Sequence, residues 1–370
     1  MIKRPRKKNK RDWMKIIAIL PVRNESWIIR HNLNILVEIC DEILVTDGDS
    51  TDGTREICSS FEKVHLLTDE EKGPVKKENR RKALLERARD FDGFNYILAL
   101  DADELLTGSF LSSDWKDLLD SMKPGDSRHF RWYWMWKSPQ HYREDDSVWS
   151  NRWMYCFFRD DRKNSYDSGN WHEARIPQAY IDRSKEAPNL GLMHFAQVGK
   201  NRMLSREAHC RVIELCKKYY SSTSINKRYV ITRDERNIRL KRVPEEWLLP
   251  WEKIGMDFEK FSDPELNYFD IEILQFFKQF GTAHFANLDI WDINWEYKRQ
   301  LALDFEVEGI PEATIHDPRN WEQRLYHSHL HCHIKNPLWR EPQRPFVQGL
   351  KKLGLKRSHF EELGLLPKIK

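Results

Sequence analysis

Short apolar segments alternate with helix-forming segments along the first hundred residues, and this alternation constrains the fold more than any other feature of the chain. The apolar segments have the length and the leucine and β-branched content of buried strands; they are residues 15–22, 42–46, 64–67 and 96–100. Helices are predicted in the intervals. Apolar residues recur at helical spacing in 25–40, a turn-rich segment leads into 54–61, and 75–90 is a segment rich in Lys and Arg. The pattern predicts an α/β fold, with a mostly parallel sheet flanked by helices.

Acidic side chains follow two of these predicted strands. Asp47 and Asp49 lie in the turn DGDSTDGT, and Asp101 and Asp103 lie in LALDADE. Ligands of open α/β sheets bind at the carboxyl ends of strands. We expect Asp101 and Asp103 to point the same way, because side chains alternate along a strand, and to bind a hard divalent cation. The alternative is that both cap the following helix.

The turn after residue 46 is rich in residues that favour helix starts. Ser50 and Asp52 are expected to cap the next helix. Asp47, still at the strand end, has no such structural task in this interpretation. It could therefore accept hydrogen bonds from a base or a ribose.

Three segments, IIAILPVRNES, ILVTDGDSTDGT and YILALDADE, resemble in order and spacing the family 2 glycosyltransferases of the GT-A fold. The resemblance covers roughly residues 14–200. It implies a Rossmann-like GT-A sheet, a nucleotide-sugar donor (a UDP-sugar being favoured), a divalent metal (Mn²⁺ or Mg²⁺) and inversion at the anomeric carbon.

The resemblance also implies roles for individual residues. The donor-binding candidates are Pro21, Asn24, Glu25, Asp47, Asp49, Arg81 and Asp101. Lys82 follows Arg81 where the family usually has Asn, so that match is partial. Asp101 and Asp103 are the metal-ligand candidates, with His194 as a third ligand or, alternatively, a core histidine.

The segment GNWHEAR, residues 169–175, looks like the G-x-x-H-E motif of a subgroup that includes lipopolysaccharide-core glucosyltransferases. This similarity implies Glu173 as the general base that deprotonates the acceptor. The alternative is that Glu173 pairs with Arg175. If Glu173 is structural, the base must be sought among Asp145, Asp146, Asp160 and Asp161. On the acceptor side, the candidates are His172, Trp171 and Trp134.

The remainder of the chain is expected to be organised around this domain. We predict a basic disordered tail at residues 1–13, a glycosyltransferase domain at 14–224 and a helical accessory region at 225–370. The accessory region is predicted to shape the acceptor site, because apolar residues recur at helical spacing in 268–280 and 289–305. Residues 326–333 (YHSHLHCH) place histidines at every second position, which indicates either a structural zinc site or a polar surface.

Charge and composition narrow the class of protein. Residues 1–11 carry seven basic groups and no acid, whereas the other 359 residues hold 55 basic and 58 acidic groups. The body is thus not a nucleic-acid-binding surface, although the tail could contact an anionic membrane or nucleic acid. No apolar stretch approaches a membrane span, and the six cysteines form no CxxC. We expect a cytoplasmic enzyme, peripheral to the membrane if the tail binds there.

Two other functions stay open at this point. A sugar-nucleotide nucleotidyltransferase would want a glycine-rich phosphate loop, and PVRNES contains no glycine. A non-catalytic carbohydrate-binding protein would not need Asp101, Asp103 and Glu173 intact. The acceptor is also open among a saccharide, a lipid-linked saccharide, a protein side chain and a nucleic-acid base.

Overall fold

The chain folds into two compact units. The computed structural model describes residues 14–68, 80–145, 150, 152–166, 174–218, 220–230, 238–258 and 261–335. The first unit takes Met1–Met203 and Arg239–Tyr268, and the second takes Leu204–Ile238 and Phe269–Lys370. The predicted basic tail at 1–13 lies outside the described residues.

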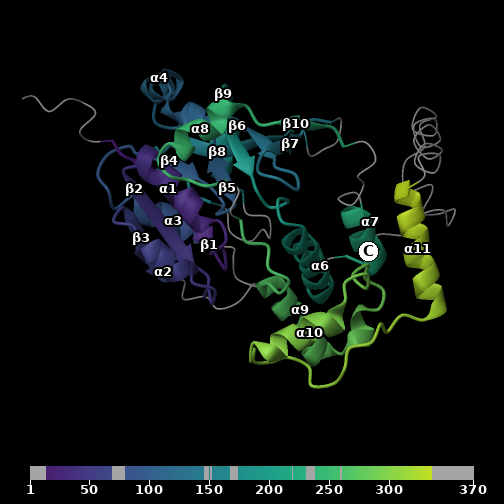
Figure 1. The fold of residues 1–370 in the computed structure, drawn as a ribbon. Helices are drawn as coiled ribbons and strands as arrows, with labels where there is room; N and C mark the ends of the chain where they lie inside the picture. Colours follow the sequence, from purple (N-terminus) through teal and green to yellow (C-terminus); the bar gives the residue numbers. More distant parts are fainter. Residues whose placement is uncertain are drawn as a thin grey trace, which may run out of the picture. The chain divides into compact units, whose positions relative to one another are not determined.

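An eight-stranded sheet forms the centre of the first unit, in the spatial order β3-β2-β1-β4-β8-β6-β9-β5 (Figure 1). Its strands are β1 (Ile16–Val22), β2 (Glu42–Asp47), β3 (Val64–Thr68), β4 (Tyr96–Ala99), β5 (Glu104–Leu106), β6 (Ser127–Trp134), β8 (Arg152–Arg159) and β9 (Ser184–His194). The four strands from β3 to β4 run parallel, as predicted. The other half is mixed: β8 is antiparallel to β4 and β6, β9 is parallel to β6, and β5 is antiparallel to β9.

Helices cover both faces of the sheet, which confirms the predicted architecture. The helices of the first unit are α1 (Ile29–Ile39), α2 (Thr54–Ser59), α3 (Arg80–Ala88), α4 (Ser113–Ser121), α5 (Gln178–Ile181) and α8 (Glu245–Glu252), with the 3₁₀ turn η3 (Gly108–Leu111). Ala18 and Leu20 of β1 pack in one core cluster with α1, whereas Ile17 and Ile19 pack in another with α3. Parallel strands that are buried on both faces have continuous apolar sequences, and these strands could therefore be predicted from the sequence.

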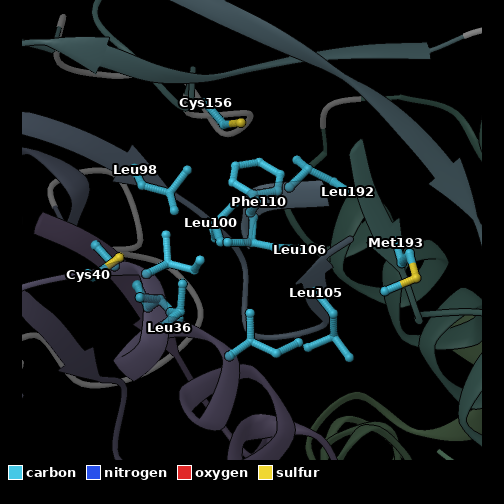
Figure 2. Close-up of a cluster of buried hydrophobic side chains, with 14 of the residues drawn as sticks. Leu36, Cys40, Leu98, Leu100, Leu105, Leu106, Phe110, Cys156, Leu192 and Met193 are labelled. Atoms are coloured by element: carbon cyan, nitrogen blue, oxygen red, sulfur yellow. The ribbon is translucent and has the colours of Figure 1, made fainter. Parts of the chain in front are cut away.

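Buried side chains flank the acidic turn between β4 and β5 on both sides. Leu98 and Leu100 precede this turn, Leu105 and Leu106 follow it, and all four lie in one cluster with Phe110 (Figure 2). Each of the five is at most 1% exposed. The polar turn is therefore anchored at both ends in a packed core.

The segment after residue 238 returns to the first unit, so the structure divides the chain differently from the expected boundary at residue 224. Strand β10 (Leu240–Arg242) pairs with β7 (His141–Arg143). Trp251 of α8 is fully buried, and its indole N–H donates to the Leu106 carbonyl over 2.8 Å. At Gly108, a Cβ would lie 2.4 Å from the Glu246 carbonyl oxygen, so only glycine permits this close approach.

The second unit is helical, as predicted for the C-terminal region. It contains most of α6 (Lys200–Cys216), α7 (Ser222–Val230), nearly all of α9 (Tyr268–Phe280), the 3₁₀ turn η5 (Thr282–Phe285), α10 (Trp295–Asp304) and α11 (Trp321–Lys335). Phe277 stacks on Trp291 at 5.3 Å between ring centroids and meets Trp295 edge-on at 5.4 Å. Helical spacing was expected over 289–305, but α10 begins at Trp295, so Trp291 lies in the preceding turn.

The histidine-rich segment forms part of α11 and packs on a loop of the same unit. His327 Nε2 lies 3.1 Å from the Asn287 carbonyl, and His331 Nε2 lies 2.8 Å from Asp289 Oδ1. Within the described residues, no group of three or more His, Cys, Asp or Glu side chains is arranged to hold a metal ion. In the described part, two of these histidines therefore serve as packing and hydrogen-bonding residues.

None of the helices in the described part of the chain combines the length and the apolar character that a membrane crossing would require.

The burial of Trp251 yields a test of the returning segment. Trp251→Ala should lower the free energy of unfolding of the first unit by about 3–5 kcal/mol, because it leaves a large cavity and removes the hydrogen bond to Leu106. Leu249→Ala in the same helix is the control, since Leu249 is 43% exposed and should change stability little. Urea unfolding followed by circular dichroism measures both; equal effects would show that α8 is not part of the core.

Candidate active site

Two loops at the carboxyl ends of β1 and β2 are joined by hydrogen bonds. Asn24, at a φ of 53°, accepts from the Thr51 amide at 2.7 Å, and its own amide donates to Ser50 Oγ at 2.8 Å. Asp52 accepts from the Ser26 amide at 2.9 Å. The expected capping role of Ser50 is therefore wrong: α2 has Gly53 as its N-cap, with no side-chain cap, and Ser50 instead binds the neighbouring loop.

Asp47 is fully buried and already has partners. Its Oδ2 accepts from Arg55 Nε at 3.0 Å and from Arg55 Nη2 at 2.7 Å. The Ser50 amide lies 3.3 Å from both carboxylate oxygens. The interpretation that Asp47 has no structural task is thus corrected, because its carboxylate fixes the turn and orients Arg55.

The other expected donor residues of this edge lie near these loops. Pro21 pairs with Thr46 across β1 and β2, and Asp49 is half-buried at a φ of 58°. Glu25 accepts from the Trp27 indole and from Arg202 Nη2, each at 2.7 Å. These residues lie at the predicted edge of the sheet, but their roles in binding a donor stay predictions.

The acidic turn does not continue strand β4. β4 ends at Ala99, so Asp101 and Asp103 lie in a turn, and the expected alternation of a strand does not apply to them. The two carboxylates consequently meet different partners. The turn is held by Asn32 of α1, which is 1% exposed and whose Nδ2 donates to the carbonyls of Asp101, Ala102 and Glu104 at 3.2, 3.0 and 2.8 Å.

Asp101 lies between two arginines. Arg81 Nη2 donates to Oδ1 at 2.5 Å, and Arg175 Nη2 donates to Oδ2 at 2.7 Å. Burial raises the pKa of Asp101, but the charges of Arg175 and Arg81 lower it more, so it titrates below the usual range. Arg81 is 4% exposed, and its buried Nη1 has no hydrogen-bond partner in the described structure.

Asp103 faces His194 instead. Asp103 Oδ2 lies 3.4 Å from His194 Nε2. His194 ends β9, where it pairs with Glu104 of β5 on one side and with Trp134 of β6 on the other. The rings of Trp132 and Trp134 lie 4.4 and 4.8 Å from the His194 ring, so the imidazole is held in an aromatic setting.

Glu104 was not singled out from the sequence, yet it connects the site. Its carboxylate is fully buried; it accepts from the Asp101 amide at 3.1 Å and from the Trp132 indole at 2.7 Å, and it pairs with Arg175. The sequence signal for this role was a glutamate at the start of an apolar strand. A carboxylate that is buried there requires hydrogen-bond or ion-pair partners.

The remaining candidates divide into two groups. Glu173, His172, Trp171 and Asp146 lie outside the described residues. Asp145, Asp160 and Asp161, the other possible bases, are each engaged locally: Asp145 with Arg143 at 2.9 Å, Asp160 with Arg89 at 2.8 Å, and Asp161 with the Tyr180 hydroxyl at 2.7 Å. Such contacts suit structural carboxylates better than a mobile proton acceptor.

Comparison with known proteins agrees with this geometry. Residues 17–123 match the model of the family Glycosyl transferase family 2, a segment that holds the four parallel strands and the acidic turn. This segment is thus similar to a family 2 glycosyltransferase domain, and the expectation of a glycosyltransferase with a GT-A-like fold is confirmed. The G-x-x-H-E subgroup stays a prediction, since residues 169–173 fall outside the match. No curated protein matches the chain.

Several solved structures are similar to the chain. A mannosyltransferase from Pyrobaculum calidifontis in complex with GDP-Man and Mn²⁺ is 14% identical, with a TM-score of 0.36, over 89% of this chain and 88% of that one. Glucosyl-3-phosphoglycerate synthase from Mycobacterium tuberculosis, in complex with Mn²⁺ and uridine-diphosphate-glucose, is 19% identical at a TM-score of 0.24, over 34% of this chain and 45% of that one. A 4-diphosphocytidyl-2C-methyl-D-erythritol synthase from Anaerococcus prevotii is 12% identical at a TM-score of 0.24, over 43% of this chain and 69% of that one. Likeness at this level carries no information on substrates.

The role of Asn32 can be tested directly. Asn32→Leu keeps the branched shape of the side chain but leaves three turn carbonyls without their donor, so UDP binding in the presence of Mn²⁺ should weaken about tenfold or more. Asn226→Leu is the matched control, because Asn226 is also fully buried and its amide joins the loop at Asn287 and Asp289 in the second unit. Calorimetric UDP binding that is unchanged in Asn32→Leu would contradict the assigned role.

Proposed function

We propose that the chain transfers a sugar from a nucleotide-sugar, a UDP-sugar being favoured, with inversion at the anomeric carbon and with Mn²⁺ or Mg²⁺ as cofactor. The observation that carries the proposal is the juxtaposition at the sheet edge: Asp103 faces His194, and next to them Asp101 is held by two arginines. All of the carboxylates and Arg81 lie within the segment that matches the family.

Two of the three predicted ligands support a divalent cation in this proposal. Asp103 Oδ2 and His194 Nε2 face each other at 3.4 Å and offer one oxygen and one nitrogen ligand, types that suit Mn²⁺. Asp101 was also predicted as a ligand; in the structure its carboxylate pairs with Arg81 and Arg175. The bound cation would neutralise charge that develops on the leaving diphosphate.

The chain's own groups would bind and orient the donor. Arg81 has a buried Nη1 without an acceptor in the described structure, and a phosphate oxygen would satisfy it. Arg55, oriented by Asp47, and the loops joined by Asn24 border the same edge of the sheet, where a base and ribose would lie. Glu25 and Asp49 complete the donor side of the proposal.

The acceptor side rests on the predicted base Glu173, with His172, Trp171 and Trp134 as acceptor contacts. Glu173 would remove the proton of the attacking hydroxyl. The acceptor is proposed as a saccharide, a lipid-linked saccharide, a protein or a nucleic-acid base, selected with the help of the helical second unit. A cytoplasmic location, with the basic tail on an anionic membrane or nucleic acid, belongs to the same proposal.

The metal role is tested by Asp103→Ala. This variant should lose Mn²⁺-dependent UDP binding and turnover while unfolding at nearly the wild-type temperature, because Asp103 contributes to the site rather than to the core. Excess EDTA should act like the substitution. Asp117→Ala is the control, an exposed aspartate on α4. Full release of UDP from UDP-sugars in EDTA would remove the metal from the account. Release of pyrophosphate from a nucleoside triphosphate incubated with a sugar 1-phosphate would indicate nucleotidyl transfer instead.

The base is tested separately by Glu173→Gln, which keeps the size of the side chain but cannot accept a proton. Turnover should fall about 10²–10⁴-fold, the usual contribution of a general base. UDP binding should stay near wild type, in contrast to Asp103→Ala. Turnover close to wild type with an identified hydroxyl acceptor would show that Glu173 is structural.

A further inference from the structure

Arg175 joins two carboxylates of the candidate site. Its Nη2 donates to Asp101 Oδ2 at 2.7 Å, and its Nη1 pairs with Glu104 Oε2. The guanidinium carbon lies 5.8 Å from the centre of the Trp132 ring, and the side chain is 13% exposed. Arg175 thus lies inside the site as a fixed positive charge.

The charges of this cluster nearly balance. The carboxylates of Asp101, Asp103 and Glu104 are accompanied by the guanidinium groups of Arg81 and Arg175. Both oxygens of Asp101 accept from an arginine. A divalent cation that approaches alone therefore meets a nearly neutral cluster, and Arg175 repels it. A nucleoside diphosphate brings further negative charge, with which Arg175 can pair.

The geometry allows Arg175 to exchange partners. The Asp101 side chain is 41% exposed, so the Arg175–Asp101 contact can be reached from solvent, unlike the contact with the fully buried Glu104. The Arg175 carbonyl accepts from the Tyr166 hydroxyl at 2.8 Å, which holds the backbone while the side chain moves. A guanidinium binds phosphate oxygens with the same fork that binds a carboxylate.

We propose that Arg175 makes cation binding depend on the nucleotide. In the protein without ligands, Arg175 neutralises Asp101 and keeps the affinity for a bare cation low. When a nucleoside diphosphate enters, Arg175 moves from Asp101 to a phosphate oxygen, and the cation and the diphosphate bind as a pair. The inference rests on the proposed function, and it adds an order of binding and a residue that enforces it.

The test measures Mn²⁺ binding without turnover. Free Mn²⁺ is followed by electron paramagnetic resonance while the metal is titrated into wild type and Arg175→Gln, with and without UDP. Wild type should bind Mn²⁺ weakly alone and much more tightly with UDP. Arg175→Gln should bind Mn²⁺ alone about tenfold or more tightly than wild type, and the gain on adding UDP should shrink correspondingly.

Two further variants separate charge from structure. Arg175→Lys keeps the charge and should bind bare Mn²⁺ like wild type. Its increase in Mn²⁺ affinity on adding UDP should be smaller, because an ammonium group lacks the paired donors of the guanidinium. Arg89→Gln removes a half-buried arginine that donates to both oxygens of Asp160, and it should alter neither quantity. In Arg175→Gln, Glu104 keeps its bonds from the Asp101 amide and Trp132, so the variant should fold.

The outcomes are distinguishable. If Arg175→Gln binds bare Mn²⁺ no more tightly than wild type and keeps the full gain from UDP, Arg175 is a structural tie and the inference is overturned. If wild type shows no gain from UDP at all, the proposed function fails first. Should Arg175→Gln not fold, Arg175→Lys decides: an undiminished gain from UDP overturns the inference.

Discussion

The candidate site depends on the hydrogen bonds and the ion pair that the buried carboxylate of Glu104 makes. Its partners come from separate places in the first unit: Arg175, the indole of Trp132 on β6, and the amide of Asp101 in the acidic turn. A carboxylate without solvent exposure is costly unless such partners are present. Glu104 therefore couples the packing of the mixed half of the sheet to the position of Asp101.

The parallel half of the sheet supplies the complementary constraint. The buried strands of this half bring three loops to one edge of the sheet. Asn32 of α1 holds the acidic turn through the backbone carbonyls of the turn, and not through the carboxylates of the turn. The carboxylates of Asp101 and Asp103 are consequently left to meet Arg81, Arg175 and His194. The contacts that hold the turn are thus separate from those of its carboxylates, as the proposed cation and diphosphate site would require.

The sequence predicted what depends on local pattern. The parallel strands, the helices on both faces and the edge carrying Asp47 and Asp101 could be read, because strands buried on both faces are apolar without interruption. The return of residues 239–268 to the first unit could not be predicted from the sequence. Strand β10 consists of three exposed residues, and the buried Trp251 has its hydrogen-bond partner at the distant Leu106. The roles of Asn32 and Glu104 were missed because they depend on distant contacts: Asn32 donates to the Glu104 carbonyl 72 residues along the chain, and Arg175, which pairs with Glu104, lies 71 residues from it.

The central claim is that the cation of the reaction lies between Asp103 and His194. A crystal structure with UDP and Mn²⁺, with data collected at the manganese edge, tests it most directly. The account predicts one anomalous peak within ligand distance of Asp103 Oδ2 and His194 Nε2, with the diphosphate on the same ion. A manganese peak elsewhere, or UDP bound away from the acidic turn, would contradict it.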